Sequence, residues 1–264
     1  MVMHRYLRVP YTLSVHEFQK PKRPKATYVF IHGIGNNAHA WDEVVAKLPK
    51  DVRIIGVDLL GFGKSAKPEW AVYDAKTQAK SLGITLLGLR LAHQPILVGH
   101  SLGALVAIEM AKRYGLVVRK LVLCSPPFYK PEIKKSGLVS ADDVLRQLYR
   151  TAKKYPERFE KMSPLAVKLG LANKSFSVTT DNRHSYFAAL EASVINQTAL
   201  VDVAELKIPV HILYGAFDPV VIKKHISRLA KKNDHITAQL LPVGHEVVGS
   251  YAKALAARLK QDLE

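Results

Sequence analysis

The chain has 264 residues, and 48% of them are hydrophobic, which is enough to bury the core of one large α/β domain. Its 39 Lys and Arg residues outnumber its 22 Asp and Glu residues, and the formal net charge of +17 predicts non-specific attraction to anionic surfaces. The cations fall in separate short groups without a nucleic-acid motif or an aromatic platform, so specific nucleic-acid binding is not expected.

Apolar runs in the chain are short. None approaches the roughly twenty residues of a transmembrane segment, and the first twenty residues lack the apolar stretch of a signal peptide. We therefore expect a cytoplasmic protein without a transmembrane segment. The one cysteine, Cys124, excludes an intramolecular disulfide, and its place in "KLVLCSPP" indicates a buried strand residue.

The predicted strands and helices alternate along the chain. Near-alternating polarity over 6–13 and 14–18 predicts two antiparallel strands, and the Pro- and Lys-rich stretch 19–26 predicts a surface turn. Continuous apolar strands indicate burial on both faces, so the expected fold class is α/β, with a mostly parallel central sheet flanked by helices. The apolar runs are 27–33, 52–59, 95–100, 119–125, 209–215 and 236–243, and helical spacing occurs at about 41–48, 76–91, 102–114, 220–231 and 246–263.

This alternation breaks once, between residues 125 and 209. The stretch is rich in helix formers, with an Asp-rich helix start after Ser140 in "SADDVLRQLYRTAKKYPERFEKM" and a later helix predicted by "SYFAALEASVI" (185–195). We expect a helical cap over residues 127–196, inserted after the sixth strand. Residues 1–126 and 197–264 would then form the core.

A polar residue interrupts the apolar segment "PILVGHSLGALVA" (95–107). Ser101 stands where a strand gives way to a helix, between Gly99 and Gly103, at the spacing of a nucleophile on a tight turn. The alternative interpretation is an ordinary helix N-cap. A serine hydroxyl becomes a good nucleophile only when a base takes its proton, and the base is best oriented by a third group.

Two further residues fit the roles of acid and base. "YGAFDPVV" places Asp218 just beyond an apolar strand and before Pro219, which alone is also an ordinary helix start. "LPVGHEVV" places His245 just beyond the last strand, where an exposed loop histidine is the alternative. Together with Ser101 they stand at the carboxyl ends of strands, where parallel sheets place their sites. This shared position favours a catalytic triad.

The motifs "HGIGNNAHAW", "DLLGFGKS", "GHSLGA", "YGAFDPVV" and "GHE" stand in the order found in a known family. The sequence resembles the α/β-hydrolase superfamily, in its lidded single-domain branch, over 27–126 and 207–264. The resemblance implies the α/β-hydrolase fold and a triad of Ser101, Asp218 and His245. It also implies an oxyanion hole formed by the backbone amides of Ile34 and Leu102. His32 is expected to support the loop beside this hole.

The resemblance implies acyl transfer, because the nucleophile position carries serine. We expect an esterase that cleaves small to medium carboxylic esters through an acyl-enzyme, with apolar cap residues lining the substrate pocket. The resemblance requires no metal or organic cofactor, and the sequence shows no clustered metal-ligand set. The expected partner is a small-molecule ester or lactone.

Three alternatives stay open. Lactone hydrolysis needs no change of machinery. A carbon–carbon bond hydrolase of the same fold typically carries "HGxGPG" and a tryptophan after the catalytic histidine, whereas this chain has "HGIGNN" and Glu246. Arg183 in "DNRH" is either the carboxylate anchor of such an enzyme or a surface residue. A non-catalytic ligand-binding receptor is the alternative outside enzymes.

Overall fold

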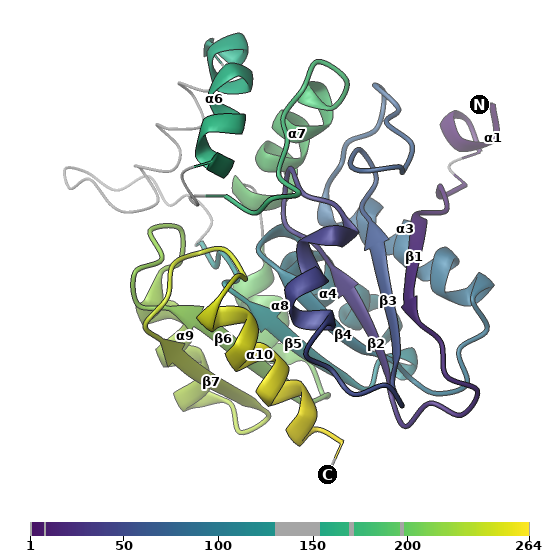
Figure 1. Cartoon of the computed structure of the whole chain (residues 1–264). Helices are drawn as coiled ribbons and strands as arrows, with labels where there is room; N and C mark the ends of the chain where they lie inside the picture. Colours follow the sequence, from purple (N-terminus) through teal and green to yellow (C-terminus); the bar gives the residue numbers. More distant parts are fainter. Residues whose placement is uncertain (1, 8, 130–153, 169–171, 196–197, 264) are drawn as a thin grey trace.

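A seven-stranded sheet forms the centre of the computed structural model (Figure 1), which describes residues 2–7, 9–129, 154–168, 172–195 and 198–263. The strand order is β1-β3-β2-β4-β5-β6-β7. β1 pairs antiparallel with β3, and the other neighbours are parallel, which confirms the predicted fold class. The strands are β1 (Ser14–Gln19), β2 (Thr27–Ile31), β3 (Arg53–Asp58), β4 (Ile96–His100), β5 (Lys120–Cys124), β6 (Val210–Gly215) and β7 (Ile236–Leu241).

Helices cover both faces of this sheet. α3, α4, α8 and α9 pack on one face, and η1, α2 and α10 pack on the other. α6 and α7 lie beyond one end of the sheet, at the top of Figure 1. No helix in the described ranges is long and apolar enough to cross a membrane. The helices are α1 (Val2–Arg5), η1 (Ala38–Trp41), α2 (Asp42–Val45), α3 (Ala75–Gly88), α4 (Leu102–Tyr114), η2 (Gly115–Val117), α6 (Pro156–Lys168), α7 (Arg183–Ala189), η3 (Leu190–Ile195), α8 (Ala199–Glu205), α9 (Lys223–Lys232) and α10 (Ser250–Gln261).

Strand β2 shows why the apolar runs are continuous. Tyr28 and Phe30 face η1, α2 and α10, while Val29 and Ile31 face α3 and α4, and all four side chains are fully buried. Burial of one such side chain stabilises the fold by about 1.5–3 kcal/mol. Cys124 of β5 is buried as well, as its sequence context predicts, and burial raises the pKa of its thiol.

The strand predicted over 6–13 is wrong. Pro10 has no N–H to give to a sheet, and the Leu13 N–H donates to Thr85 Oγ1 at 2.8 Å instead of to a neighbouring strand. Leu13 is buried, whereas Tyr6 and Leu7 are largely exposed, so the alternating polarity here does not reflect a buried and an exposed strand face. The helical insertion therefore follows the fifth strand, and the prediction that it follows the sixth is corrected.

The stretch 127–196, which we call the insertion, is described at 127–129, 154–168 and 172–195. Most of the helix predicted after Ser140 falls outside these residues, and α6 covers its end. The helix predicted over 185–195 is present as α7 followed by the wider, π-helical η3. Hydrogen bonds join the insertion to the loop after β2, so it borders the carboxyl end of the sheet.

Candidate active site

Ser101 occupies a strained turn between β4 and α4. Its φ is 51° and its ψ is −115°, a conformation that non-glycine residues rarely adopt. A Cβ at Gly99 would lie 2.4 Å from Gly103 O, and a Cβ at Gly103 would lie 2.1 Å from Ile31 O. The two glycines are therefore required for β2, β4 and α4 to approach each other.

The structure of the turn also tests the alternative interpretation of Ser101 as an ordinary helix N-cap. Ser101 does stand at the N-cap position of α4, but its side chain makes no capping hydrogen bond. The hydroxyl oxygen of an N-cap serine normally accepts a hydrogen bond from one of the first helical N–H groups. The hydroxyl of Ser101 is therefore not engaged in capping α4 and is available for another role.

Each of four adjacent strands is followed by a polar residue at the same end of the sheet. Ser101 follows β4, Ser125 follows β5, Asp218 lies in the loop after β6, and His245 lies in the loop after β7. The sheet hydrogen bonding continues past the strand ends. The bonds run from Ser101 N to Cys124 O (3.0 Å), from Ser125 N to Leu213 O (2.8 Å) and from Ala216 N to Leu241 O (2.7 Å).

Asp218 and His245 form a hydrogen-bonded pair. Nδ1 of His245 donates to Oδ2 of Asp218 at 2.8 Å, and the aspartate is almost fully buried. Oδ1 of Asp218 accepts from the backbone N–H groups of Val220 (2.8 Å) and Val221 (3.2 Å). One carboxylate oxygen therefore stabilises the turn after β6, and the other orients the histidine. The helix-start interpretation of Asp218 is wrong, because α9 begins only at Lys223 and Ile222 is its N-cap.

Electrostatics in this pair favour a proton on the histidine. Burial lowers the pKa of His245, but the hydrogen bond and charge of Asp218 and the charge of Glu246 outweigh it, so the pKa lies above 6.5. Burial raises the pKa of Asp218, but the His245 hydrogen bond and charge, the Val220 N–H and the Ser125 hydroxyl hold it below 3.8. The pair is built to accept a proton on the imidazole beside an ionised carboxylate.

His100, the residue before Ser101, connects the Ser101 turn to the loop that carries His245. Among the described residues, no hydrogen bond joins the Ser101 hydroxyl to His245. His100, directly before Ser101, donates from Nε2 to the backbone carbonyl of His245 at 3.0 Å. Burial and the His245 charge lower the pKa of His100 to about 3, so it stays a neutral donor. Catalytic hydrogen bonds are often long without substrate and shorten once it binds.

The loop after β2 runs against the Ser101 turn. A Cβ at Gly33 would lie 2.9 Å from His100 Nδ1 and 3.4 Å from Ser101 Cβ. Within the described residues, the backbone N–H groups of Ile34 and Leu102 donate to no protein atom, and Leu102 begins a helix, where N–H groups lack intrahelical partners. Two backbone N–H groups that donate to no described protein atom therefore lie in the segments on either side of the Ser101 turn.

Two buried side chains support the loop formed by residues 33–41. His32 donates from Nδ1 to Gly33 O at 2.7 Å and accepts at Nε2 from the Leu59 N–H at 2.9 Å. Burial lowers the pKa of His32, in keeping with this neutral tautomer. Oδ1 of Asp58 accepts from the Ala38 N–H at 2.7 Å. Both ring nitrogens of His32 are occupied, as a supporting residue requires.

The insertion holds the other side of the same loop through residues 173–177, which we call the strap. The ring of Phe176 packs on Gly35, where a Cβ would come within 2.5 Å of it, and Gly35 has a φ of 75°. Three hydrogen bonds join the strap to the 33–41 loop: from Ser177 N to Gly35 O (2.8 Å), from Ser175 Oγ to Asn36 Oδ1 (2.8 Å) and from Asn173 Nδ2 to Ala40 O (3.2 Å).

Sequence reasoning missed Ser125 and the electrostatic role of Glu246. Ser125 is fully buried with a φ of 48°, its hydroxyl stabilises the Asp218 carboxylate, and it lies 3.3 Å from Tyr251 Oη. A polar residue at the end of an apolar strand and before two prolines was the available signal. Glu246 is half-buried beside His245, and it accepts a hydrogen bond from the backbone N–H of Asn173 in the strap, which lies far away in sequence.

Arg183, a further candidate from the sequence, lies outside this cluster. Its Nη1 is 3.6 Å from Glu160 Oε2, within the insertion, which favours its interpretation as a surface residue. In the part of the chain that the structure describes, no three His, Cys, Asp or Glu side chains gather as a metal site requires.

Comparisons with known proteins agree with this fold. Residues 28–258 match the family described as the alpha/beta hydrolase family. Probable lysophospholipase BODYGUARD 4 of Arabidopsis thaliana is 29% identical over 119 residues, which cover 44% of this chain but 28% of that protein. An esterase from Exiguobacterium antarcticum has a TM-score of 0.75 at 18% identity, covering 95% of each chain. The enol-lactonase from Burkholderia xenovorans has a TM-score of 0.71 at 19% identity, covering 95% and 96%.

Proposed function

Because this chain belongs to the alpha/beta hydrolase family, we propose that it is a serine hydrolase that cleaves small to medium carboxylic esters. The observation that carries the proposal is the 2.8 Å hydrogen bond between Asp218 and His245, at the sheet end where the strained Ser101 turn presents an uncapped hydroxyl. Nucleophile, base and orienting acid are the three groups that acyl transfer by serine needs.

In the proposed cycle, Ser101 Oγ attacks the ester carbonyl carbon while His245 Nε2 takes its proton. The oxyanion that forms is stabilised by the N–H groups of Ile34 and Leu102, each worth about 3–4 kcal/mol in such sites. His245 then protonates the departing alcohol, which leaves an acyl-enzyme. Water attacks this ester with His245 as base, the carboxylic acid leaves, and the Ser101 hydroxyl is restored.

The charge distribution supports these roles. Asp218 is ionised at neutral pH, because its pKa is lowered, and it stabilises the imidazolium that His245 becomes after each proton transfer. The neutral His100 holds the backbone of the histidine loop in place. No step needs a group that the chain does not supply.

We further propose that residues 127–196 form a cap on the core made by 1–126 and 197–264. The strap contacts support this division, since they place the insertion against the 33–41 loop. The solved esterase and enol-lactonase are similar in fold alone, so an ester and a lactone are both retained as substrate classes. The "HGIGNN" loop and Glu246 depart from the carbon–carbon hydrolase pattern and disfavour that reaction.

The direct test uses p-nitrophenyl butyrate. The wild-type chain is expected to turn it over, and Ser101→Ala should lower kcat by about 10⁵–10⁶-fold. Ser227→Ala on α9, outside the site, is the matched control and should keep full activity. A fluorophosphonate should label the wild type and the control at Ser101 and leave Ser101→Ala unlabelled.

Two outcomes would contradict the proposal. One is a folded protein that turns over none of a panel of esters and lactones, which would favour the non-catalytic receptor. The other is turnover that persists in Ser101→Ala. Faster hydrolysis of lactones than of linear esters would keep the mechanism and change the substrate class.

A further inference from the structure

An apolar groove of about 740 Å³ lies at the opposite end of the sheet from Ser101. Its walls are the end of α3, the loop that leads into β4, the end of α4 and η2. Pro95, which lines it, directly precedes β4, whereas Ser101 directly follows that strand. The groove is therefore separate from the candidate active site.

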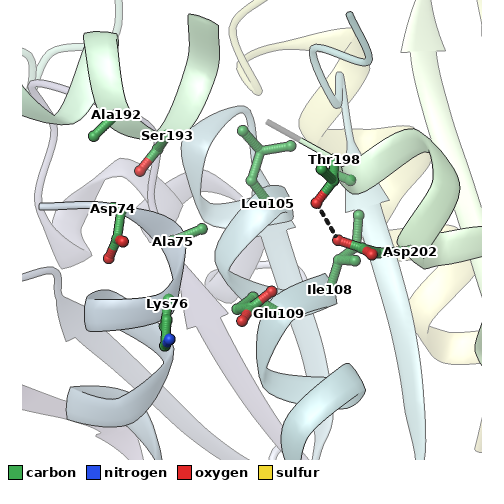
Figure 2. A pocket seen from close by; sticks show the side chains of 11 residues that line it. Asp74, Ala75, Lys76, Leu105, Ile108, Glu109, Ala192, Ser193, Thr198 and Asp202 are labelled. Atoms are coloured by element: carbon green, nitrogen blue, oxygen red, sulfur yellow. Dashed lines mark hydrogen bonds between the residues drawn. The ribbon is translucent and has the colours of Figure 1, made fainter. Parts of the chain in front are cut away.

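A second cavity, shown in Figure 2, differs from the groove in its volume and in the role of its polar side chains. It measures about 190 Å³ between α3, α4, η3 and α8, and it is lined by Asp74, Glu109 and Asp202 among others. All three carboxylates have partners within the fold, and Glu109 pairs with Arg113. Asp202 binds Thr198 (2.7 Å, dashed in Figure 2) and Lys112 (2.7 Å), and Asp74 caps α3. That cavity is small and its polar groups serve the fold.

The groove, in contrast, exposes large apolar side chains. Leu87 at the end of α3 is 78% exposed, Leu116 in η2 is 91% exposed, and Val117 is 50% exposed. Each of these side chains forgoes part of the stabilisation that burial of an apolar group provides. All three line the same groove, and a groove lined mainly by apolar side chains with a few charged ones is the usual form of a small-molecule site.

The charge of the groove has one sign. Lys80, Arg90 and His93 line it, and no lining residue is Asp or Glu. Neither Lys80 nor Arg90 forms an ion pair with a carboxylate in the described ranges. The C-terminal ends of α3 and α4 contribute about half a negative charge each. The two cations outweigh them, so the rim stays positive.

The position of Arg90 is unusual. It follows Leu89, the C-cap of α3, with a φ of 47°, the left-handed conformation that normally selects glycine after a helix. An arginine here accepts the steric cost of that conformation and brings a guanidinium to the groove. Its planar N–H fork matches the geometry of a carboxylate.

We propose that this groove binds the anion of a medium- or long-chain fatty acid. The hydrocarbon chain lies along the apolar walls, covers Leu87 and Leu116, and the carboxylate pairs with Arg90 and Lys80. The volume falls within the roughly 300–1,000 Å³ of small-molecule sites. The inference is independent of the proposed ester hydrolysis, since no residue is shared between the two sites.

The test is calorimetric titration of the full chain with monomeric sodium decanoate, after Ser101 has been blocked with a fluorophosphonate or replaced by alanine. We expect one binding site. The double variant Lys80→Glu/Arg90→Glu should weaken binding at least tenfold. Lys231→Glu/Lys232→Glu, which makes the same charge change on exposed residues of α9, should leave the Kd unchanged. Decan-1-ol should bind at least tenfold more weakly than decanoate.

A second variant guards against loss of folding. Leu116→Ser removes an exposed side chain, so it should keep the wild-type urea midpoint and still weaken decanoate binding. The proposal is overturned by absence of binding, by binding that the charge reversal leaves unchanged, or by binding that disappears when Ser101 is blocked. Binding to anionic phosphatidylglycerol vesicles without binding of monomeric decanoate would overturn it too, and would assign the groove to a membrane surface.

Discussion

The Ser101 turn and the 33–41 loop are the two halves of the candidate site, and different parts of the chain hold them. The turn is fixed by close approach of core backbone, where Gly103 meets Ile31 O. The loop is fixed from one side by His32 and Asp58 of the core and from the other by the strap. The nucleophile geometry therefore belongs to the core alone, while the proposed oxyanion hole is coupled to the insertion.

The two kinds of support also differ in energy. Backbone contact at the turn leaves no room for an added atom, so a change there displaces β2, β4 and α4 together. The strap contributes single hydrogen bonds, each worth about 0.5–1.5 kcal/mol net. Changes at the turn should therefore disrupt the fold, and changes at the strap should adjust the activity.

The largest effect is expected for Gly103→Ala. Its Cβ would lie 2.1 Å from Ile31 O and 2.7 Å from His32 O, which are backbone atoms of β2 and the residue after it. We expect destabilisation at the upper end of the roughly 1–3 kcal/mol that overpacking costs, together with loss of the proposed esterase activity. Urea denaturation measures the first and p-nitrophenyl butyrate turnover the second.

Gly88→Ala is the matched control for this change. A Cβ at Gly88 meets nothing within 4 Å, and alanine is favoured over glycine in helices by up to about 1 kcal/mol. The control should therefore be as stable as the wild type or slightly more so. Equal stability of Gly103→Ala and Gly88→Ala would show that the turn is not held by close backbone approach.

The Ser101 turn could be predicted from the sequence better than the contacts of the 33–41 loop, because different kinds of contact hold them. The glycine spacing around Ser101 is a local signal, and α4 begins and ends where the pattern predicted, at Leu102 and Tyr114. Asp218 and His245 were expected near each other because parallel strands end at one edge, and their hydrogen bond agrees with that expectation. Short-range patterns and sheet topology were enough for these residues.

His32 was expected to support the 33–41 loop, but the supports that the strap provides gave no such signal. Ser175 and Asn36 are 139 residues apart, and neither residue type at its position indicates a partner. The groove was missed because the exposure of Leu87 and Leu116 depends on what packs beside them, which periodicity does not reveal. The strand predicted over 6–13 was wrong for a related reason. Alternation of polar and apolar residues is compatible with an irregular surface segment as well as with a strand.

A moderate effect is expected for Ser175→Ala, which removes the hydroxyl 2.8 Å from Asn36 Oδ1. The 33–41 loop loses one attachment, and the Ile34 N–H of the proposed oxyanion hole is held less firmly. We expect kcat to fall about 3- to 10-fold with KM nearly unchanged, because the interaction acts in the transition state. Steady-state kinetics on p-nitrophenyl butyrate separates the two constants.

Two further variants serve as controls for this test. Ser175→Thr keeps the hydroxyl and should restore most of kcat. Ser163→Ala removes a hydroxyl elsewhere in the insertion, where it donates to Glu160 O (3.0 Å) and Val178 O (3.4 Å) but, among the described residues, to no atom of the 33–41 loop, and it should leave kcat unchanged. A fall in kcat of equal size for Ser163→Ala would mean that the strap has no special link to the oxyanion side.

The smallest effect is expected for Glu246→Gln, and it concerns pH. His245 must be neutral to act as a base, so activity is lost as pH falls through its pKa, which lies above 6.5. The acid limb of kcat/KM for the wild type should therefore have its inflection above pH 6.5. Glu246 is one of the groups that raise this pKa, so removing its charge should move the limb to lower pH.

This change isolates electrostatics because Glu246 acts on His245 through its charge, whereas substitution of Asp218 would also misorient the imidazole. Glu246 itself is half-buried next to the backbone N–H of Asn173, so the strap influences the histidine loop as well as the 33–41 loop. Glu205→Gln, an exposed change on α8, should leave the limb in place. If the limb stays unmoved in Glu246→Gln, or moves to higher pH, then the histidine that titrates is not controlled by this carboxylate, and the insertion's influence ends at the oxyanion half.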